Sequence, residues 1–86
     1  MNTLANKNIS PFASKLWFSE DMMYVLLTDG REIGVPILWF SKLRKATPSQ
    51  LNNFRFIGNG IGIHWEELNE DISVAGLLAG NLESQF

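Results

Sequence analysis

The only histidine of the chain, His64, is the first side chain to consider for chemistry, because an imidazole exchanges protons near neutral pH. As a general base it would need an orienting carboxylate and a substrate pocket, and Glu66 and Glu67 lie close in the sequence. On a strand, His64 and Glu66 share one face, Glu67 points away, and the bulky Trp65 lies between them. We therefore expect a partly buried structural histidine and no catalytic residues, and keep an enzyme that uses His64 as the less favoured alternative.

Three glycines in five residues, Gly58, Gly60 and Gly62, could expose backbone amides to a phosphate group. Their spacing is not that of a dinucleotide-binding loop, no P-loop lysine follows, and the segment leads into a predicted strand. We expect a tight hairpin turn and no cofactor. A metal site is not expected either, because the acidic residues lack calcium-loop spacing and one histidine without cysteine cannot supply a zinc set.

Charge is divided along the chain, whose net charge is −2. Residues 33–65 contain no acid, whereas residues 66–86 contain five acids and no base. The simplest interpretation is that the two segments attract each other within the fold or are solvated. A weak nucleic-acid patch formed by Lys42, Arg44 and Lys45 is the alternative, although the negative net charge gives no general attraction to nucleic acid.

The N-terminal segment and the absence of cysteine bear on location. A chain without cysteine fits a reducing compartment. Residues 1–14 contain one lysine and no apolar run of secretory length, and no later segment is apolar enough for a membrane span. We expect a cytoplasmic protein without a membrane partner, in which residues 1–14 are a flexible tail and residues 15–86 form one domain.

A β-hairpin is expected around Asp29-Gly30. Residues 22–28 are rich in strand-favouring types, and Asp-Gly suits a two-residue turn in which both positions have positive φ. Such a turn gives the pairs Leu26–Ile33 and Tyr24–Val35. We expect these four side chains to form the core face of the hairpin.

The opposite face of the same predicted strand is apolar as well, with Met23, Val25 and Leu27. A strand that is apolar on both faces is usually central in its sheet, covered on the second side by a helix or another subunit. We therefore predict that Met23, Val25 and Leu27 form a partner surface, occupied by another protein or by a second copy in a homodimer.

Short helices and a second hairpin complete the prediction. Residues 39–46 have apolar positions at helical spacing, and Thr47 with Gln50 forms a capping box that begins a second short helix. A hairpin on Asn59-Gly60 gives the pairs Ile57–Gly62, Phe56–Ile63 and Arg55–His64. Its expected core residues are Phe54, Phe56, Ile63 and Trp65. A last helix, capped by Asp71 or Ser73 with the preceding acids at its start, ends at Gly80.

The predicted fold class is therefore α+β. It consists of two β-hairpin units with about five strands in a mixed or antiparallel sheet and short helices, in the order βββ-α-ββ-α.

Several short motifs follow one another in a recognisable order. They are Asp29-Gly30-Arg31, Val35-Pro36, Trp39-Phe40, Leu43, Ala46-Thr47, Gly62-Ile63-His64-Trp65, Leu68, Glu70-Asp71-Ile72-Ser73-Val74 and Leu77-Leu78. This series, over about residues 16–80, resembles the domain-of-unknown-function family 2442 (DUF2442) of small bacterial domains. Ser41 and Glu66 stand where that family often has proline.

The resemblance implies a mixed α+β fold and supplies no activity or catalytic residues. It also implies two kinds of context: longer relatives that continue into a helix-turn-helix domain, and relatives encoded beside another small family, similar to toxin–antitoxin pairs. We therefore expect a non-catalytic protein-interaction module, such as an antitoxin-like partner of a co-encoded small protein. The alternative is a regulatory or sensory domain related to transcription factors, with weak nucleic-acid contact.

Overall fold

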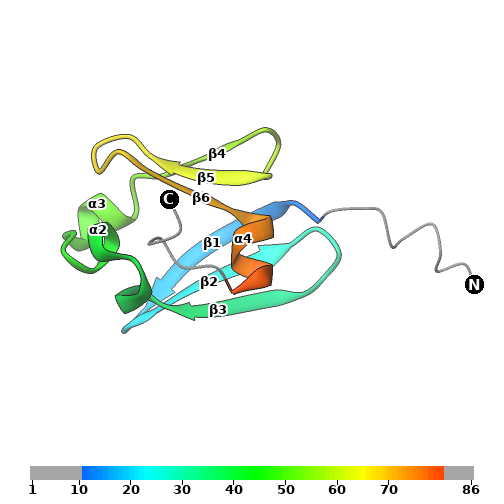
Figure 1. Ribbon diagram of the computed structural model, residues 1–86, viewed down its shortest axis with the longest axis horizontal. Helices are drawn as coiled ribbons and strands as arrows, with labels where there is room; N and C mark the ends of the chain where they lie inside the picture. Colours follow the sequence, from blue (N-terminus) through cyan, green and yellow to red (C-terminus); the bar gives the residue numbers. More distant parts are fainter. Residues whose placement is uncertain (1–10, 81–86) are drawn as a thin grey trace, which may run out of the picture.

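Two three-stranded antiparallel sheets share one hydrophobic core in the computed structural model, which describes residues 11–80 (Figure 1). The first sheet contains β1 (Ala13–Ser19), β2 (Met22–Leu27) and β3 (Glu32–Pro36), in that spatial order. The second contains β4 (Arg55–Ile57), β5 (Gly62–Trp65) and β6 (Glu70–Ser73), also in that order. The helical elements are the 3-10 helix η1 (Ile37–Trp39), α2 (Ser41–Arg44), α3 (Pro48–Leu51) and α4 (Val74–Ala79).

The predicted α+β class is confirmed, with one strand more than expected. The acids predicted to begin the last helix, Glu70 and Asp71, lie instead on β6, which pairs with β5. Only one of the four residues of β6 is apolar, so the sequence there carries no strand signal. Helix α4 begins after β6, where the Ser73 hydroxyl accepts a hydrogen bond of 2.9 Å from the Gly76 amide.

The first hairpin has a register one residue away from the predicted one. Its loop contains three residues, because the Leu27 amide donates to the Arg31 carbonyl at 2.8 Å and Gly30 adopts a left-handed φ of 95°. The strands accordingly pair Met23 with Val35, Val25 with Ile33 and Leu26 with Glu32. A slip of one residue exchanges the faces of one strand relative to its partner. Strand β2 therefore turns its other side to the core, while Ile33 and Val35 of β3 lie on the core side as predicted.

The face assignment of β2 is therefore corrected. Met23, Val25 and Leu27, predicted as a partner surface, are 0, 0 and 2% exposed and lie in the hydrophobic core of the chain itself. Tyr24 and Leu26, predicted as core, are half-buried on the opposite face. The central position predicted for this strand is confirmed.

Strand β1 begins inside the segment predicted to be a tail. Its first residue, Ala13, is buried, and its amide donates to the Gly60 carbonyl at 2.7 Å. The Phe12 amide donates to the Thr28 hydroxyl at 3.0 Å. The ordered fold thus starts before the predicted boundary at residue 15, while the prediction for residues 1–10 lies outside the described residues.

The second hairpin has the predicted pairs Arg55–His64, Phe56–Ile63 and Ile57–Gly62. Gly60, in its turn, has a φ of 105°, and a Cβ atom there would lie 2.3 Å from the Ala13 carbonyl oxygen. Glycine is required at this position because the backbone of β1 approaches it closely. This packing accounts for Gly60 without any phosphate.

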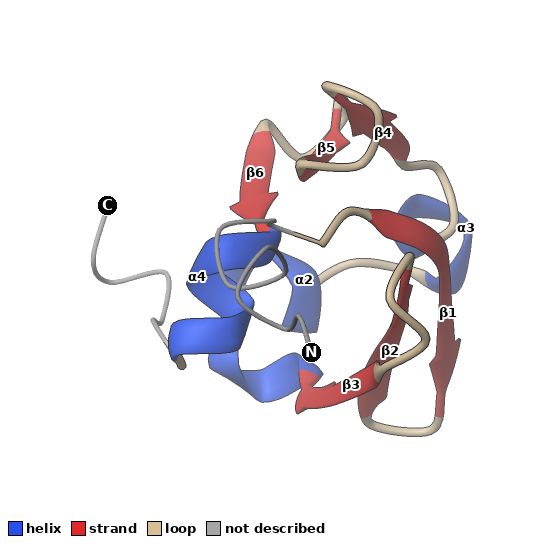
Figure 2. Ribbon diagram, turned by 90° about the vertical axis from the view of Figure 1, so that its right-hand side faces the viewer, coloured by secondary structure: helices blue, strands red, loops and turns tan. Residues whose placement is uncertain are grey.

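The helix predicted over residues 39–46 is two short elements, η1 and α2, separated by Phe40 in an extended conformation. Phe40 and Leu43 are buried as expected, whereas Trp39 is 41% exposed. The Thr47–Gln50 capping box at α3 is confirmed. Figure 2 shows α2 and α4 beside the two sheets. Within residues 11–80, the longest helix has six residues, so none could cross a bilayer.

Candidate functional site

The outward face of the second sheet carries a charged row with His64 at its centre. Cross-strand pairing aligns Arg55, His64 and Asp71 on β4, β5 and β6. The Nδ1 atom of His64 contacts the Asp71 carboxylate, and its Nε2 atom lies 3.2 Å from Oε1 of Glu66. The same Glu66 oxygen lies 3.2 Å from a guanidinium nitrogen of Arg55. The His64 side chain is 16% exposed, as predicted for a partly buried histidine.

The side-chain contacts of His64 involve both ring nitrogens. Each nitrogen lies against a carboxylate, and both contacts are hydrogen bonds only when both nitrogens carry protons. The carboxylates of Glu66 and Asp71 approach opposite sides of the ring and cannot converge with one ring nitrogen on a single ion. Among residues 11–80 no group of three histidine or acidic side chains could hold a metal ion.

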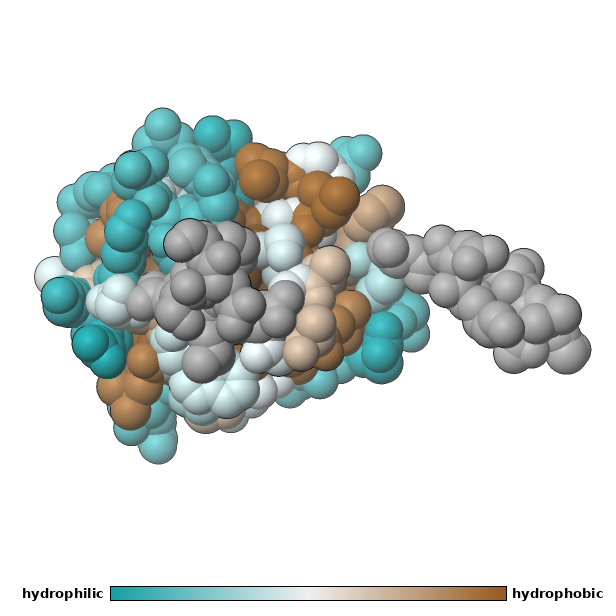
Figure 3. Space-filling view, viewed as in Figure 1, coloured by the Kyte–Doolittle hydropathy of each residue, from teal (hydrophilic) through white to brown (hydrophobic). Residues whose placement is uncertain are grey.

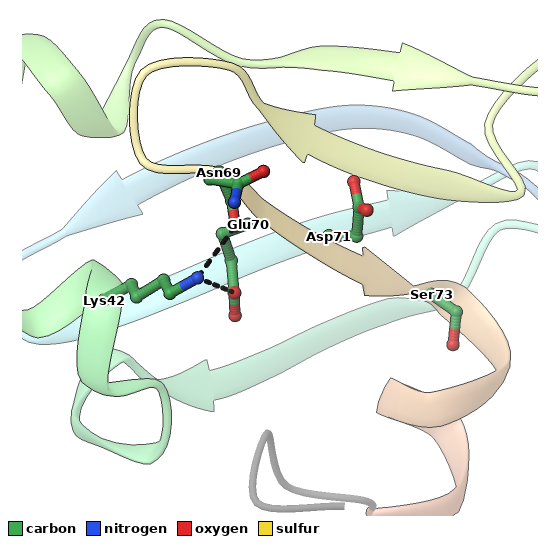
Figure 4. A pocket seen from close by; sticks show the side chains of 5 residues that line it. All are labelled: Lys42, Asn69, Glu70, Asp71 and Ser73. Atoms are coloured by element: carbon green, nitrogen blue, oxygen red, sulfur yellow. Dashed lines mark hydrogen bonds and ion pairs between the residues drawn. The ribbon is translucent and has the colours of Figure 1, made fainter. Parts of the chain in front are cut away.

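A polar cavity of about 360 Å³ lies between α2 and β6 (Figure 4). It is lined by Lys42, Asn69, Glu70, Asp71 and Ser73. The Lys42 ammonium donates to the Asn69 carbonyl at 2.9 Å and lies 3.9 Å from the Glu70 carboxylate. The basic and acidic segments of the chain therefore meet here, as they do between Arg55 and Glu66.

The predicted nucleic-acid patch is not one continuous cationic surface. Lys42 is directed toward Glu70 on β6, which offsets its charge, while Arg44 and Lys45 are exposed to solvent. Two exposed cations are a weak basis for contact with a phosphate backbone, which requires several.

A small apolar cavity of about 120 Å³ lies beside α4 and is lined by Pro11, Ile61, Val74, Ala75 and Leu78. Figure 3 shows apolar surface over the turn between β4 and β5. Ile61 is 54% exposed and Leu78 41% exposed. Cavities that hold small-molecule ligands usually measure about 300–1,000 Å³, so this one has room only for a group the size of a side chain.

A further, partly apolar surface lies on the side of β1–β2–β3 that faces away from the core. We call it the outer face; it is formed by Lys15, Trp17, Met22, Tyr24, Leu26, Glu32, Gly34 and Pro36. The Trp17 and Tyr24 rings stack with their centroids 5.8 Å apart and an interplanar angle of 21°. Trp17 is 36% exposed, and Met22, Tyr24 and Leu26 are half-buried. A Cβ atom at Gly34 would lie 2.9 Å from the Tyr24 ring, so this ring covers Gly34.

The outer face was missed because the one-residue slip exchanged the two sides of β2. The sequence predicted an exposed apolar surface on β2, but on the side of the strand that is buried. The available signal was the Thr28-Asp29-Gly30 segment, which fits a three-residue loop with glycine in the left-handed position.

These features define the chain as a small α+β domain of two antiparallel three-stranded sheets. The chain belongs to the family described as protein of unknown function (DUF2442), whose model matches residues 13–83. The predicted family is thus confirmed.

Two solved structures have folds similar to that of this chain. A crystal structure of a protein of unknown function from Rhodospirillum rubrum is 32% identical, with a TM-score of 0.77 over 86% of this chain and 92% of that chain. A solution NMR structure of an uncharacterised protein from Chromobacterium violaceum is 25% identical, with a TM-score of 0.73 over 92% of this chain and 73% of that chain. No curated protein matches the sequence.

Proposed function

We propose that this chain is a non-catalytic protein-interaction module that binds its partner through the outer face. The observation that carries the proposal is the stacked Trp17–Tyr24 pair, held on the side of the first sheet that the core does not use. Tryptophan and tyrosine are enriched at protein interfaces, because they supply a large apolar area at a small cost in conformational entropy. An ordered and partly exposed aromatic pair is suited to such contact.

The charges beside the aromatic pair specify the chemistry of the partner. Lys15 and Glu32 flank Leu26 in one row of the outer face. The partner should therefore have an apolar centre, with an acidic group opposite Lys15 and a basic group opposite Glu32. A co-encoded small protein, in an antitoxin-like arrangement, is one form of this proposal. The lack of cysteine supports a cytoplasmic setting.

Two further observations support a non-catalytic role. The side chain first considered for chemistry, His64, has carboxylates at both ring nitrogens. The larger cavity is lined by Lys42 and Glu70, which lie close to each other, and by the side chains of β6 beside them. Neither arrangement combines a nucleophile, an orienting base and an apolar substrate pocket.

Oxidative footprinting tests the proposal. We expect the modification rates of Trp17, Met22 and Tyr24 to fall when the chain is placed in concentrated extract or is itself concentrated. Trp39 is the internal control, because it is similarly exposed at 41% but lies on η1. Unchanged rates at Trp17 and Tyr24 under both conditions would refute the proposal, as would protection of Trp39 alone.

A further inference from the structure

We propose that the outer face binds a second copy of this chain, sheet against sheet, about a two-fold axis parallel to β2. This inference rests on the proposed function, because it assumes that the outer face is the binding surface. A second copy is the occupant that fits, because the outer face is complementary to itself in charge and brings its aromatic residues together under the same rotation. A two-fold dimer needs such a surface, since the same patch serves both partners.

The charge complementarity arises from one row of cross-strand neighbours. Lys15 on β1 pairs with Leu26 on β2, and Leu26 pairs with Glu32 on β3. The row therefore has a cation at one edge of the sheet, an apolar residue at the centre and an anion at the other edge. A two-fold rotation about an axis along β2 exchanges the edges, so each Lys15 lies over the Glu32 of the other copy.

The adjacent row provides an aromatic contact. It contains Trp17, Tyr24 and Gly34, again on β1, β2 and β3. The same rotation brings each Trp17 over the Gly34 of the other copy, which is covered by the Tyr24 ring with the Met22 methyl group beside it. The indole of one copy therefore packs on the aromatic ring of its partner.

The direction of the axis follows from the same residues. An axis perpendicular to the strands would lay β1 on β1 and β3 on β3. Strand β1 contains no acid and β3 contains no base, so Lys15 and Glu32 would then lie opposite strands without a countercharge. Only the axis along β2 pairs both charges of the row.

The size of the outer face sets the expected affinity. Strand spacing and rise give a patch of roughly 14 by 20 Å, which is below the usual interface of about 800 Å² per partner. We therefore expect a reversible dimer with a Kd on the order of tens of micromolar.

Sedimentation equilibrium from low micromolar to millimolar concentration, at low ionic strength, tests the dimer with charge-reversal variants. Lys15→Glu or Glu32→Lys alone should weaken dimerisation by about tenfold or more, because each creates two like-charge contacts. The double variant should dimerise like the wild-type chain. Arg44→Glu, which makes the same charge change at an exposed position of α2, should have no effect.

An equimolar mixture of the two single variants gives the sharpest result. In the mixed dimer the introduced carboxylate meets the introduced ammonium, while the native Lys15 and Glu32 meet across the second contact. The mixture should therefore associate about as tightly as the wild-type chain, although neither variant does so alone. Circular dichroism of each variant checks that it is folded.

Three outcomes would overturn the dimer. These are a wild-type chain that is monomeric at millimolar concentration, single variants that dimerise like the wild-type chain, or a mixture of the two variants that associates no more tightly than either variant alone. A monomer whose Trp17 and Tyr24 are nevertheless protected in extract would overturn the dimer and leave the interaction module standing. Absence of both association and protection would remove both proposals.

Discussion

The two sheets of this protein have the same architecture, but their outward faces differ in chemical character. Each is antiparallel with three strands, and each buries one side in the shared core. The outward side of β4–β5–β6 carries Arg55, His64 and Asp71, which contact one another or Glu66. The outward side of β1–β2–β3 carries the stacked Trp17 and Tyr24. A face whose charges are already paired suits water, whereas an aromatic face has more to gain from a partner.

The largest effect that tests this comparison is expected from a tryptophan in the core. Trp65 is fully buried, and its indole nitrogen donates to the Leu51 carbonyl at 2.9 Å. We expect Trp65→Ala to lower the free energy of unfolding by about 3–5 kcal/mol, because it removes a large side chain and leaves a cavity. Trp17→Ala should cost less than about 1 kcal/mol in the monomer. Urea denaturation in dilute solution measures both. A large loss with Trp17→Ala would mean that the outer face supports the fold and is not free for binding.

Two neighbouring methionines on β2 test which side of the first sheet is the core. Met23 is fully buried, while Met22 is half-buried on the outer face. Met23→Ala should lower the unfolding free energy by about 2–5 kcal/mol and Met22→Ala by less than about 1 kcal/mol. The same denaturation experiment compares them. Equal losses would contradict the observed register of the hairpin.

His64→Ala tests whether the charged face serves only the fold. We expect a loss of about 1 kcal/mol, because the contacts with Asp71 and Glu66 involve largely exposed carboxylates. Sedimentation of this variant should match that of the wild-type chain, since His64 lies on the second sheet. Weakened association would show that the two outward faces are not as different in role as proposed.

The smallest effect concerns Asp29 in the first hairpin turn. The Arg31 amide, which donates to the Asp29 carboxylate at 3.0 Å, lowers the pKa of Asp29 below its ordinary value of 3.8, with further help from the Arg31 side chain. A carboxyl group whose pKa is lower in the folded state stabilises the fold above the unfolded pKa and loses this contribution as the pH falls through the folded pKa.

The measurement for Asp29 is the difference in unfolding free energy between the wild-type chain and Asp29→Asn as a function of pH. We expect a small advantage of the wild-type chain at neutral pH that declines below about pH 4. A difference that does not change with pH would contradict the assigned role of the Arg31 amide.

Local signals in the sequence predicted the turns and caps better than the faces of the strands. The predictions of the Asn59-Gly60 turn and the Thr47–Gln50 box were correct, because short-range hydrogen bonds determine both, between backbone groups in the turn and between side chains and backbone in the box. Asp29-Gly30 predicted the position of the turn correctly, but Asp-Gly fits loops of two or three residues. The difference of one residue in loop length decides which side of β2 is buried.

Strand β6 and the contacts of His64 could not be predicted from local patterns. Strand β6 exists because it pairs with β5, and its sequence has little apolar character of its own. Asp71 lies beside His64 only because β6 is a strand. Since β6 was not predicted, the contact between Asp71 and His64 was not predicted either. Both features depend on tertiary context, which overrides propensity in short segments.

The start of β1 touches the turns of both hairpins, and this limits how the chain can fold. The Phe12 amide is bonded to Thr28 in the first turn, and the Ala13 amide to Gly60 in the second. Neither half of the molecule can complete its hydrogen bonds without the other, so we expect a single cooperative transition with contacts far apart in sequence. Cutting the chain between the sheets would leave two fragments that must find each other before either acquires stable structure.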